Sequence, residues 1–257
     1  MELKKTPLIV AIAGKGGVGK TIITTLIAKA ISTSYKLKLL LIDADPTHPH
    51  LSKMVKLVPE KSLEKIRADL IENTISKKED LQSIAEDIDF KVYNAIKESK
   101  EFSLFSIGQP EGPGCFCPSN ALLRKVIESI SSDFDVVLID CEAGLEQINR
   151  MVIKSVDILL IVTDISLRSV ETAKSISESA KKFTNYKRIG IIINRVRGEI
   201  PGILDKLKEY ELSVLMLIPE DDLLTKFDLE GKPIIDISEA SVSFQKIKQN
   251  IDSILEL

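Results

Sequence analysis

Tryptophan is missing from this chain, and aromatic residues as a whole make up only 5% of its 257 residues. A core built from this composition has to be mainly aliphatic, because 44% of the residues are nonetheless hydrophobic. Runs of isoleucine, leucine and valine are typical of the buried strands of a parallel sheet. The shortage of aromatic residues therefore suits an α/β fold.

Concentrated positive charge and long apolar runs are absent as well. The formal net charge is −3 with no long basic tract, so nothing in the sequence indicates a nucleic-acid surface. No apolar run approaches the length needed to cross a bilayer, and the N-terminus lacks the features of a signal peptide. We therefore expect a cytoplasmic protein with no membrane or nucleic-acid partner. Its three cysteines are expected to be reduced thiols rather than a disulfide framework.

Apolar runs alternate with amphipathic stretches of helical length. Repeated strand–helix units imply a doubly wound, mostly parallel sheet flanked by helices. With no linker rich in glycine or proline and no internal repeat, a single domain over residues 1–257 is expected. The predicted strands are Leu8–Ala13, Leu37–Asp43, Ser103–Gly108, Asp135–Asp140, Ile158–Thr163, Ile189–Asn194 and Ser213–Ile218. The predicted helices include Ile22–Ser32, Asn120–Ile130, Arg168–Phe183 and Pro201–Tyr210.

The interval between residues 46 and 100 interrupts this alternation. It is charged, has a largely helical pattern and lies between the second and third predicted strands. We interpret it as a solvated helical insertion, with a partner-recognition surface as the alternative. His48 and His50 at its start could ligate a metal, although histidines beside prolines in a loop are more often simply exposed.

A glycine-rich segment follows the first predicted strand directly and opens the first predicted helix. It matches the phosphate-binding pattern G-x-x-x-x-G-K-[ST] in the strand–loop–helix context that this pattern requires, and it reads Gly14-Lys15-Gly16-Gly17-Val18-Gly19-Lys20-Thr21. Glycines let successive N–H groups converge on one anion, and the helix N-terminus adds partial positive charge. Lys20 can reach the β- and γ-phosphates, and the Thr21 hydroxyl can bind Mg²⁺. A chance glycine loop is the alternative, and the intact context favours a nucleotide site.

Two predicted strands end in aspartate, at the edge where open α/β sheets bind their ligands. One strand runs into Asp43-Ala44-Asp45-Pro46, and the other runs into Asp140-Cys141-Glu142-Ala143-Gly144. Carboxylates at this edge can face Mg²⁺ and the attacking water, which is the positioning that phosphoryl transfer needs. The alternative role of such an aspartate is to cap a helix or a turn.

The glycine loop also resembles that of a narrower family, because its second residue is lysine. The string Gly-Lys-Gly-Gly-Val-Gly-Lys-Thr is similar to the deviant Walker A motif of the SIMIBI-class ATPases, which include MinD, ParA and the nitrogenase iron protein. The resemblance implies a P-loop NTPase that hydrolyses ATP with Mg²⁺ and forms an ATP-dependent homodimer through Lys15. A solvated loop lysine is the alternative interpretation of Lys15, and the resemblance favours the signature lysine. The resemblance further implies that Asp45 positions or activates the attacking water and joins Thr21 at the Mg²⁺ site, that Asp140 binds Mg²⁺ through water, and that Gly144 senses the γ-phosphate.

Two later strand ends fit recognition of an adenine base. Asn194-Arg195 ends one strand with an amide, which can act as donor and acceptor toward the base edge. Pro219-Glu220-Asp221 ends the next strand, and Glu230-Gly231-Lys232-Pro233 follows it. In this order they resemble the MinD-type adenine pocket and its Gly-x-Pro. The guanine-selecting aspartate of Asn-Lys-x-Asp signatures does not follow Asn194, so ATP is expected rather than GTP. The implied nucleotide contacts, besides the glycine loop and Gly144, are Ile22, Asn194, Arg195, Pro219, Glu220 and Asp221.

Cys115 and Cys117 form a Cys-x-Cys pair just before a predicted helix. Such a pair in a cytosolic protein is a candidate soft-metal site, because a disulfide between residues two apart is strained and a nearby helix N-terminus favours thiolates. Two thiolates fill half of a four-coordinate shell, so a two-fold dimer would complete a Cys₄ site for Ni²⁺ or Zn²⁺. Two buried core thiols are the alternative. Cys141, just past a buried strand, is expected to be structural.

The cysteine segment resembles that of the CooC branch of this family, the nickel-insertion ATPases of carbon monoxide dehydrogenase maturation. The similarity covers Gly114-Cys115-Phe116-Cys117-Pro118-Ser119-Asn120-Ala121-Leu122-Leu123-Arg124, which carries an extra Cys-Phe relative to the pattern of the branch, and Asp140-Cys141-Glu142-Ala143-Gly144-Leu145-Glu146. Gln147 departs from the branch, which commonly has histidine there. The resemblance implies a metallochaperone whose client is a nickel enzyme, carbon monoxide dehydrogenase or its acetyl-CoA synthase complex.

Two other functions stay open. A MinD/ParA-type spatial organiser is one, although MinD proteins end in a basic membrane-binding helix and this chain ends in the acidic stretch Asn250–Leu257 without lysine or arginine. An iron–sulfur carrier ATPase is the other, although those proteins usually carry Cys-x-x-Cys. The leading hypothesis is the nickel metallochaperone.

Overall fold

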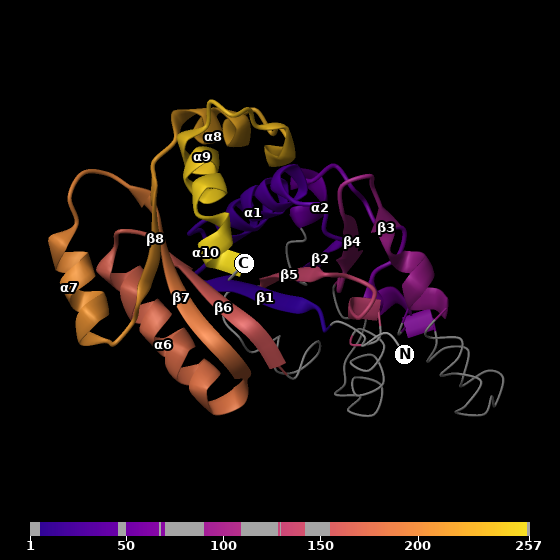
Figure 1. The fold of residues 1–257 in the computed structure, drawn as a ribbon, viewed down its shortest axis with the longest axis horizontal. Coiled ribbons are helices and arrows are strands. Elements are labelled where there is room, and N and C mark those ends of the chain that lie inside the picture. Colours follow the sequence, from indigo (N-terminus) through magenta and orange to yellow (C-terminus); the bar gives the residue numbers. More distant parts are fainter. Residues whose placement is uncertain are drawn as a thin grey trace.

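The computed structural model describes residues 6–45, 50–66, 68–69, 90–108, 128, 130–141 and 155–255. Within these residues, eight strands form one sheet in the order β3-β4-β2-β5-β1-β6-β7-β8 (Figure 1). The strands are β1 (Leu8–Gly14), β2 (Leu39–Ala44), β3 (Lys97–Glu98), β4 (Ser103–Ser106), β5 (Val136–Cys141), β6 (Ser155–Thr163), β7 (Asn185–Val196) and β8 (Val214–Pro219). The helices whose bounds lie within these residues are α1 (Lys20–Ser34), α2 (Leu51–Met54), α6 (Leu167–Phe183), α7 (Pro201–Glu209), α8 (Asp222–Leu229), α9 (Val242–Gln249), α10 (Ile251–Leu255) and the short 3₁₀ helix η2 (Ile234–Asp236).

The predicted mostly parallel, doubly wound sheet is confirmed. Every neighbouring pair of strands runs parallel except β3 and β4, which are antiparallel. Strand β3 lies inside the interval 46–100, at the C-terminal end of the predicted, largely helical insertion. Its two residues are exposed, and this short charged edge carries no apolar run for the sequence pattern to detect. Most of the predicted helix Asn120–Ile130 lies outside the described residues.

Side chains of the central strand β1 alternate between two apolar clusters, one on each face of the sheet. Val10 and Ile12 belong to the cluster that α1, α9 and α10 cover. Ala11 and Ala13 belong to the cluster that α6 and α7 cover. Figure 1 shows these two sets of helices on opposite sides of the sheet. Strands buried on both faces explain why the apolar runs of the sequence are nearly continuous.

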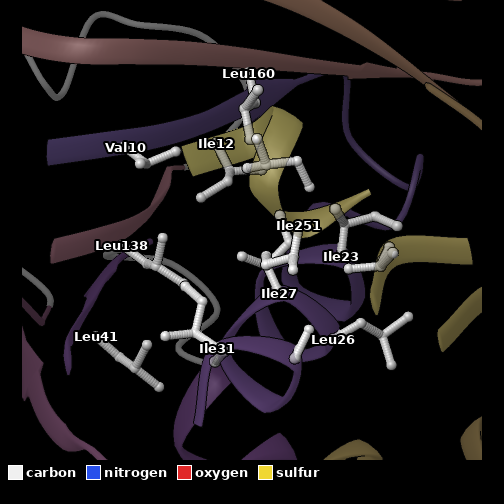
Figure 2. Packing of buried hydrophobic residues seen from close by; sticks show 14 of the residues in the cluster. Val10, Ile12, Ile23, Leu26, Ile27, Ile31, Leu41, Leu138, Leu160 and Ile251 are labelled. Atoms are coloured by element: carbon white, nitrogen blue, oxygen red, sulfur yellow. The ribbon is translucent and has the colours of Figure 1, made fainter. Parts of the chain in front are cut away.

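Helix α1 packs its apolar stripe onto the middle of the sheet. Figure 2 shows Ile23, Ile27 and Ile31 on the side of the helix that faces the sheet, with Ile251 of α10 beside them. These three isoleucines are at most 1% exposed. Burying each such side chain stabilises the fold by about 1.5–3 kcal/mol. Helix α1 is therefore held firmly against the sheet, and this fixes the position of the C-terminal end of the glycine loop.

The C-terminal helix α10 is part of this core. Ile251, Ile254 and Leu255 are at most 3% exposed, and α10 contacts both α1 and α9. The apolar residues near the chain end are therefore used for packing against the helix that begins at the glycine loop. Among the described residues, no helix is both long enough and apolar enough to span a bilayer.

Asp221 ties α8 to α9. Its Oδ1 accepts hydrogen bonds from the N–H groups of Leu223 (2.9 Å) and Leu224 (3.2 Å), which caps α8. Its Oδ2 accepts from the Ser241 hydroxyl (2.6 Å) and the Ser243 N–H (2.9 Å) at the start of α9. Burial acts to raise the pKa of Asp221, but the hydrogen bonds outweigh it and the pKa is lowered. The ionised carboxylate therefore holds the two helices in place.

Replacing Asp221 with alanine is expected to lower the free energy of unfolding by about 2 kcal/mol, because four donors, two of them in buried hydrogen bonds, lose their acceptor. Urea unfolding followed by circular dichroism measures this loss. The control is Asp222→Ala, one residue further on and exposed, which should change the free energy by less than about 0.5 kcal/mol. Equal losses for the two variants would contradict the capping role.

Candidate functional site

The glycine loop is closely packed at both of its ends. Gly14 ends β1 with φ of 150°, and a Cβ there would lie 2.3 Å from the Val162 carbonyl oxygen of β6. Gly19 precedes α1 with φ of 94°, and a Cβ there would lie 2.6 Å from Nδ2 of Asn194. Side chains at these positions would push the loop off its neighbouring strands. The two glycines therefore let the loop sit directly on β6 and β7.

The middle of the loop is open. A Cβ at Gly16 or Gly17 would meet nothing within 4 Å, and both residues are exposed. A ligand can therefore approach this stretch of backbone closely. The loop leads into the N-terminus of α1, a helix of 15 residues with no acidic residue in its first turn. An exposed loop backbone at such a helix end is suited to binding an anion.

The side chain of Lys20 lies close to the backbone of the loop. The Nζ atom of Lys20 donates a hydrogen bond to the carbonyl oxygen of Lys15 at 3.3 Å. Lys15 and Lys20 are each half-buried. The positive charge of Lys20 is thus already held at the loop, beside the N–H groups that would receive a phosphate.

The predicted carboxylates come together beside the start of α1. Asp43 of β2 is the register partner of Asp140 of β5, so the two side chains lie at the same level of the sheet. Oδ1 of Asp140 accepts a hydrogen bond from the Thr24 hydroxyl at 3.2 Å, and the Thr21 hydroxyl also donates to this carboxylate. Asp45 follows β2 directly, is half-buried, and donates its N–H to Oδ1 of Asp43 at 3.3 Å.

Burial disfavours negative charge on this pair of aspartates. It raises the pKa of Asp43 to about 7, and the charges of Asp140 and Asp45 add to the effect. It raises the pKa of Asp140 to about 6, although the Thr21 hydroxyl and the Lys20 charge act in the opposite direction. Crowded carboxylates beside a hydroxyl are hard oxygen ligands, and a divalent cation bound to them would relieve their repulsion.

This donor set fits Mg²⁺ rather than a cation that needs a complete protein cage. Within the described part of the chain, no group of three or more histidine, cysteine, aspartate or glutamate residues is arranged to hold a metal. Mg²⁺ is commonly bound by one or two carboxylates, with waters and substrate phosphates as the other ligands. The site therefore suits Mg²⁺ that arrives with a nucleotide.

A cavity of about 270 Å³ lies beside the loop, where β7 and β8 end. It contains five of the residues predicted for base recognition and Ile22 of α1. The sequence did not single out its other residues, which come from α8 and α9 and have no motif of their own. The lining consists of Ile22, Asn194, Arg195, Pro219, Glu220, Asp221, Leu224, Thr225, Asp228, Leu229 and Ser243.

The polar residues of this cavity also have structural roles. Nδ2 of Asn194 donates to the Val18 carbonyl oxygen of the glycine loop at 2.8 Å, so one amide hydrogen is used by the loop. Asp221 is the helix cap described above, and Glu220 forms an ion pair with Arg197. Asn194 therefore both lines the cavity and holds the loop.

Thr24 is a site residue that the sequence pattern did not identify. Its side chain is fully buried and reaches Asp140 from the first turn and a half of α1. Thr24 follows Thr21 by three residues, which places both hydroxyls on one helix face, and that spacing could have revealed it. Cys141 is buried as expected, and burial raises the pKa of its thiol. The predicted Gly144, Cys115, Cys117 and His48 lie outside the described residues.

Comparison with known proteins agrees with this geometry. The family model described as the CobQ/CobB/MinD/ParA nucleotide binding domain matches residues 9–234. The chain therefore belongs to this family. Its members are ATPases, and the protein is accordingly a nucleotide-binding ATPase of the MinD/ParA type.

Two relatives and one solved structure illustrate the similarity. An uncharacterized ATP-binding protein of Methanocaldococcus jannaschii is 32% identical, over 96% of this chain and 98% of its own. The carbon monoxide dehydrogenase accessory protein CooC of Rhodospirillum rubrum is 31% identical, over 90% of both chains. The septum site-determining protein MinD of Pyrococcus horikoshii, solved with Mg-ADP, has a TM-score of 0.67 at 21% identity and covers 96% of both chains.

The variant Asp43→Asn is expected to stabilise the nucleotide-free protein at high pH. The raised pKa means that the folded state keeps a proton that the unfolded state has released between about pH 4 and about pH 7, so the free energy of unfolding falls as pH rises through this range. Asparagine removes the charge and should add roughly 1–2 kcal/mol at about pH 8 and little at about pH 5.

Urea unfolding at the two pH values measures the effect of Asp43→Asn. The matched control is Asp205→Asn on α7, an exposed aspartate whose replacement should have no pH-dependent effect. A destabilised Asp43→Asn variant at the higher pH would show that the ionised carboxylate is not a source of strain.

Proposed function

We propose that this ATPase is a metallochaperone that delivers nickel to an enzyme of the carbon monoxide dehydrogenase or acetyl-CoA synthase type. Two observations support the proposal. The first is the similarity to CooC over most of both chains. The second is the pair Cys115 and Cys117, whose spacing supplies half of a thiolate site in each chain of a homodimer. The protein would act in the cytoplasm as one domain over residues 1–257.

In this proposal the loop binds the triphosphate of ATP. Lys20 stabilises the β- and γ-phosphates, and the backbone N–H groups of the open loop complete the anion site. Thr21 and Asp45 would hold Mg²⁺, with Asp140 bound to it through water. The cation neutralises the phosphate oxygens when bound. Asp45 also orients the water that attacks the γ-phosphate.

In the homodimer, binding of the nucleotide is coupled to binding of the nickel or zinc ion. Lys15 reaches the nucleotide of the partner subunit, so that ATP draws the two chains together, and Gly144 responds to the γ-phosphate. Because the Cys₄ site needs both chains, ATP and metal favour the same dimer, and each should raise the affinity for the other. Hydrolysis then loosens the dimer and releases the metal to the client.

A spatial-organising ATPase of the MinD/ParA kind is the second candidate. The family match and the shared fold support it as much as they support a metallochaperone. The apolar residues of α10 are buried in the core, so this helix does not offer them to a membrane. The cysteine pair is the feature that favours the metallochaperone.

Lys20→Ala and Asp45→Ala should affect turnover differently. Removing the Lys20 ammonium is expected to reduce both ATP binding and hydrolysis, with turnover falling by about 100-fold or more. Removing the Asp45 carboxylate should leave ATP binding within about threefold, because Lys20 and the loop still hold the triphosphate. Turnover should fall at least about 100-fold, because the water is misplaced and Mg²⁺ loses one ligand. Phosphate release and binding of a fluorescent ATP analogue measure the two effects. Normal turnover by Asp45→Ala would show that another residue positions the water.

The metallochaperone predicts one Ni²⁺ or Zn²⁺ per dimer, bound more tightly with a non-hydrolysable ATP analogue than with ADP. Calorimetric titration gives the stoichiometry, and light scattering gives the oligomeric state under the same conditions. The double variant Cys115→Ser, Cys117→Ser should lose the site but still hydrolyse ATP. Lys15→Ala should lose the effect of the ATP analogue on both dimer and metal.

Each alternative has its own outcome in this titration. Tight binding of one metal per monomer would refute a site shared between chains. Metal binding that is unchanged in the double serine variant would refute the thiolate ligands. ATP-dependent dimerisation with no metal binding would favour the spatial organiser.

A further inference from the structure

Two consecutive residues at the end of β7 reach the glycine loop. Nδ2 of Asn194 donates to the Val18 carbonyl oxygen at 2.8 Å, and a terminal nitrogen (Nη1) of Arg195 donates to the Gly17 carbonyl oxygen at 3.2 Å. In a regular strand, consecutive side chains point to opposite faces of the sheet. The backbone must therefore depart from regular geometry for both side chains to hold the same loop.

The departure is visible at Arg195. Its φ is 56°, in the left-handed region, and the register between β7 and β8 shifts between Ile193 and Val196. A left-handed conformation costs a residue with a side chain about 1–2 kcal/mol. Such strain persists where the surrounding structure enforces it, and it is concentrated at functional sites. Here its effect is to place the guanidinium group on the loop.

The two hydrogen bonds fix the direction of two N–H groups. In a trans peptide the carbonyl and the N–H point in opposite directions. Holding the Gly17 carbonyl from outside therefore turns the Val18 N–H toward the inside of the loop, and holding the Val18 carbonyl does the same for the Gly19 N–H. Inward-pointing N–H groups are what an anion-binding loop requires.

Gly17 depends on this restraint more than its neighbours do. It is exposed, has φ of 81°, and would have nothing within 4 Å of a Cβ, so no close packing fixes its peptide plane. Val18, in contrast, is only 1% exposed and is held by the core. The hydrogen bond from Arg195 thus restrains the Gly17–Val18 peptide, whose plane is otherwise the least restrained in the loop.

We propose that Arg195 is a positioning residue for nucleotide hydrolysis, which aligns the Val18 N–H with the phosphates through its hydrogen bond to Gly17. The proposal rests on the loop being the triphosphate site. Arg195 also lines the base cavity beside Ile22 and Leu224, where a planar guanidinium can stack on a purine ring. One side chain therefore links the base to the phosphate loop, and a bound purine nucleotide keeps it in place.

The test uses Arg195→Gly, because glycine accepts the left-handed backbone and removes only the side chain. Its melting temperature should stay within a few degrees of the wild type, while kcat for ATP falls about tenfold and KM changes less than about threefold. Arg195→Lys, which keeps a donor and a charge, should recover part of kcat. The matched control is Glu211→Gly, which has the same φ of 56° far from the loop and should keep full activity.

A second readout does not require hydrolysis. When inorganic triphosphate is added to the ¹⁵N-labelled protein, the amide protons of Val18 and Gly19 should move downfield as they bind phosphate. In Arg195→Gly the shift of Val18 should be lost, and that of Gly19, which Asn194 holds, should persist. Wild-type shifts in a protein that does not hydrolyse ATP would refute the proposed hydrolysis mechanism, whereas the orientation of the Val18 N–H group by Arg195 would still hold.

Two results would overturn the proposal. If Arg195→Gly raised KM and left kcat unchanged, Arg195 would contribute to nucleotide binding in the cavity but not to hydrolysis. A Val18 shift in Arg195→Gly equal to that of the wild type would show that the hydrogen bond to Gly17 does not orient this N–H group.

Discussion

The direct contact of the glycine loop with β6 and β7 is the constraint on which the site depends. Gly14 and Gly19 lie so close to Val162 and Asn194 that a Cβ at either position would overlap them. On the other side, α1 is anchored by an aliphatic stripe packed onto the sheet (Figure 2). The loop therefore connects β1 and α1, two elements that pack in the same core and cannot move independently. Its backbone N–H groups can thus keep a fixed arrangement.

The buried aspartates at the carboxyl ends of β2 and β5 lower the stability of the folded protein and favour the binding of a cation. Asp43 and Asp140 are buried side by side, and burial raises the pKa of both carboxyl groups. Such a pair weakens the folded protein when it is ionised, so packing elsewhere has to compensate. The same repulsion is relieved by a cation, which makes the edge ready for a nucleotide that carries Mg²⁺. Strain of another kind, the left-handed backbone of Arg195, occurs on the opposite side of the loop. The loop thus lies between a pair of buried carboxylates on one side and a strained backbone on the other.

The sequence by itself determined the sheet and the chemistry of the loop. Continuous apolar runs predict buried parallel strands, because both faces of each strand are covered, and all seven predicted strands are present. The spacing of Gly14, Gly19, Lys20 and Thr21 specifies a phosphate loop, since the requirement is local to one strand–loop–helix unit. The sequence also places Asp45 and Asp140 at the carboxyl ends of strands, because the end of an apolar run marks the end of a strand. Strand β7 begins earlier than predicted, at Asn185, because pairing with β6 extends into residues that are partly exposed and polar.

Only the tertiary structure decided which distant residues meet at the loop. The hydrogen bonds of Asn194 and Arg195 join positions more than 170 residues apart in the chain, as their sequence separations of 176 and 178 show. No local pattern encodes such contacts, because they arise from strand order and from a backbone bulge between β7 and β8. The cavity at the ends of β7 and β8 likewise needs α8 and α9, and the capping role of Asp221 depends on the junction of these two helices. Sequence spacing specifies what a local segment can bind, whereas strand order and packing determine which residues position that segment.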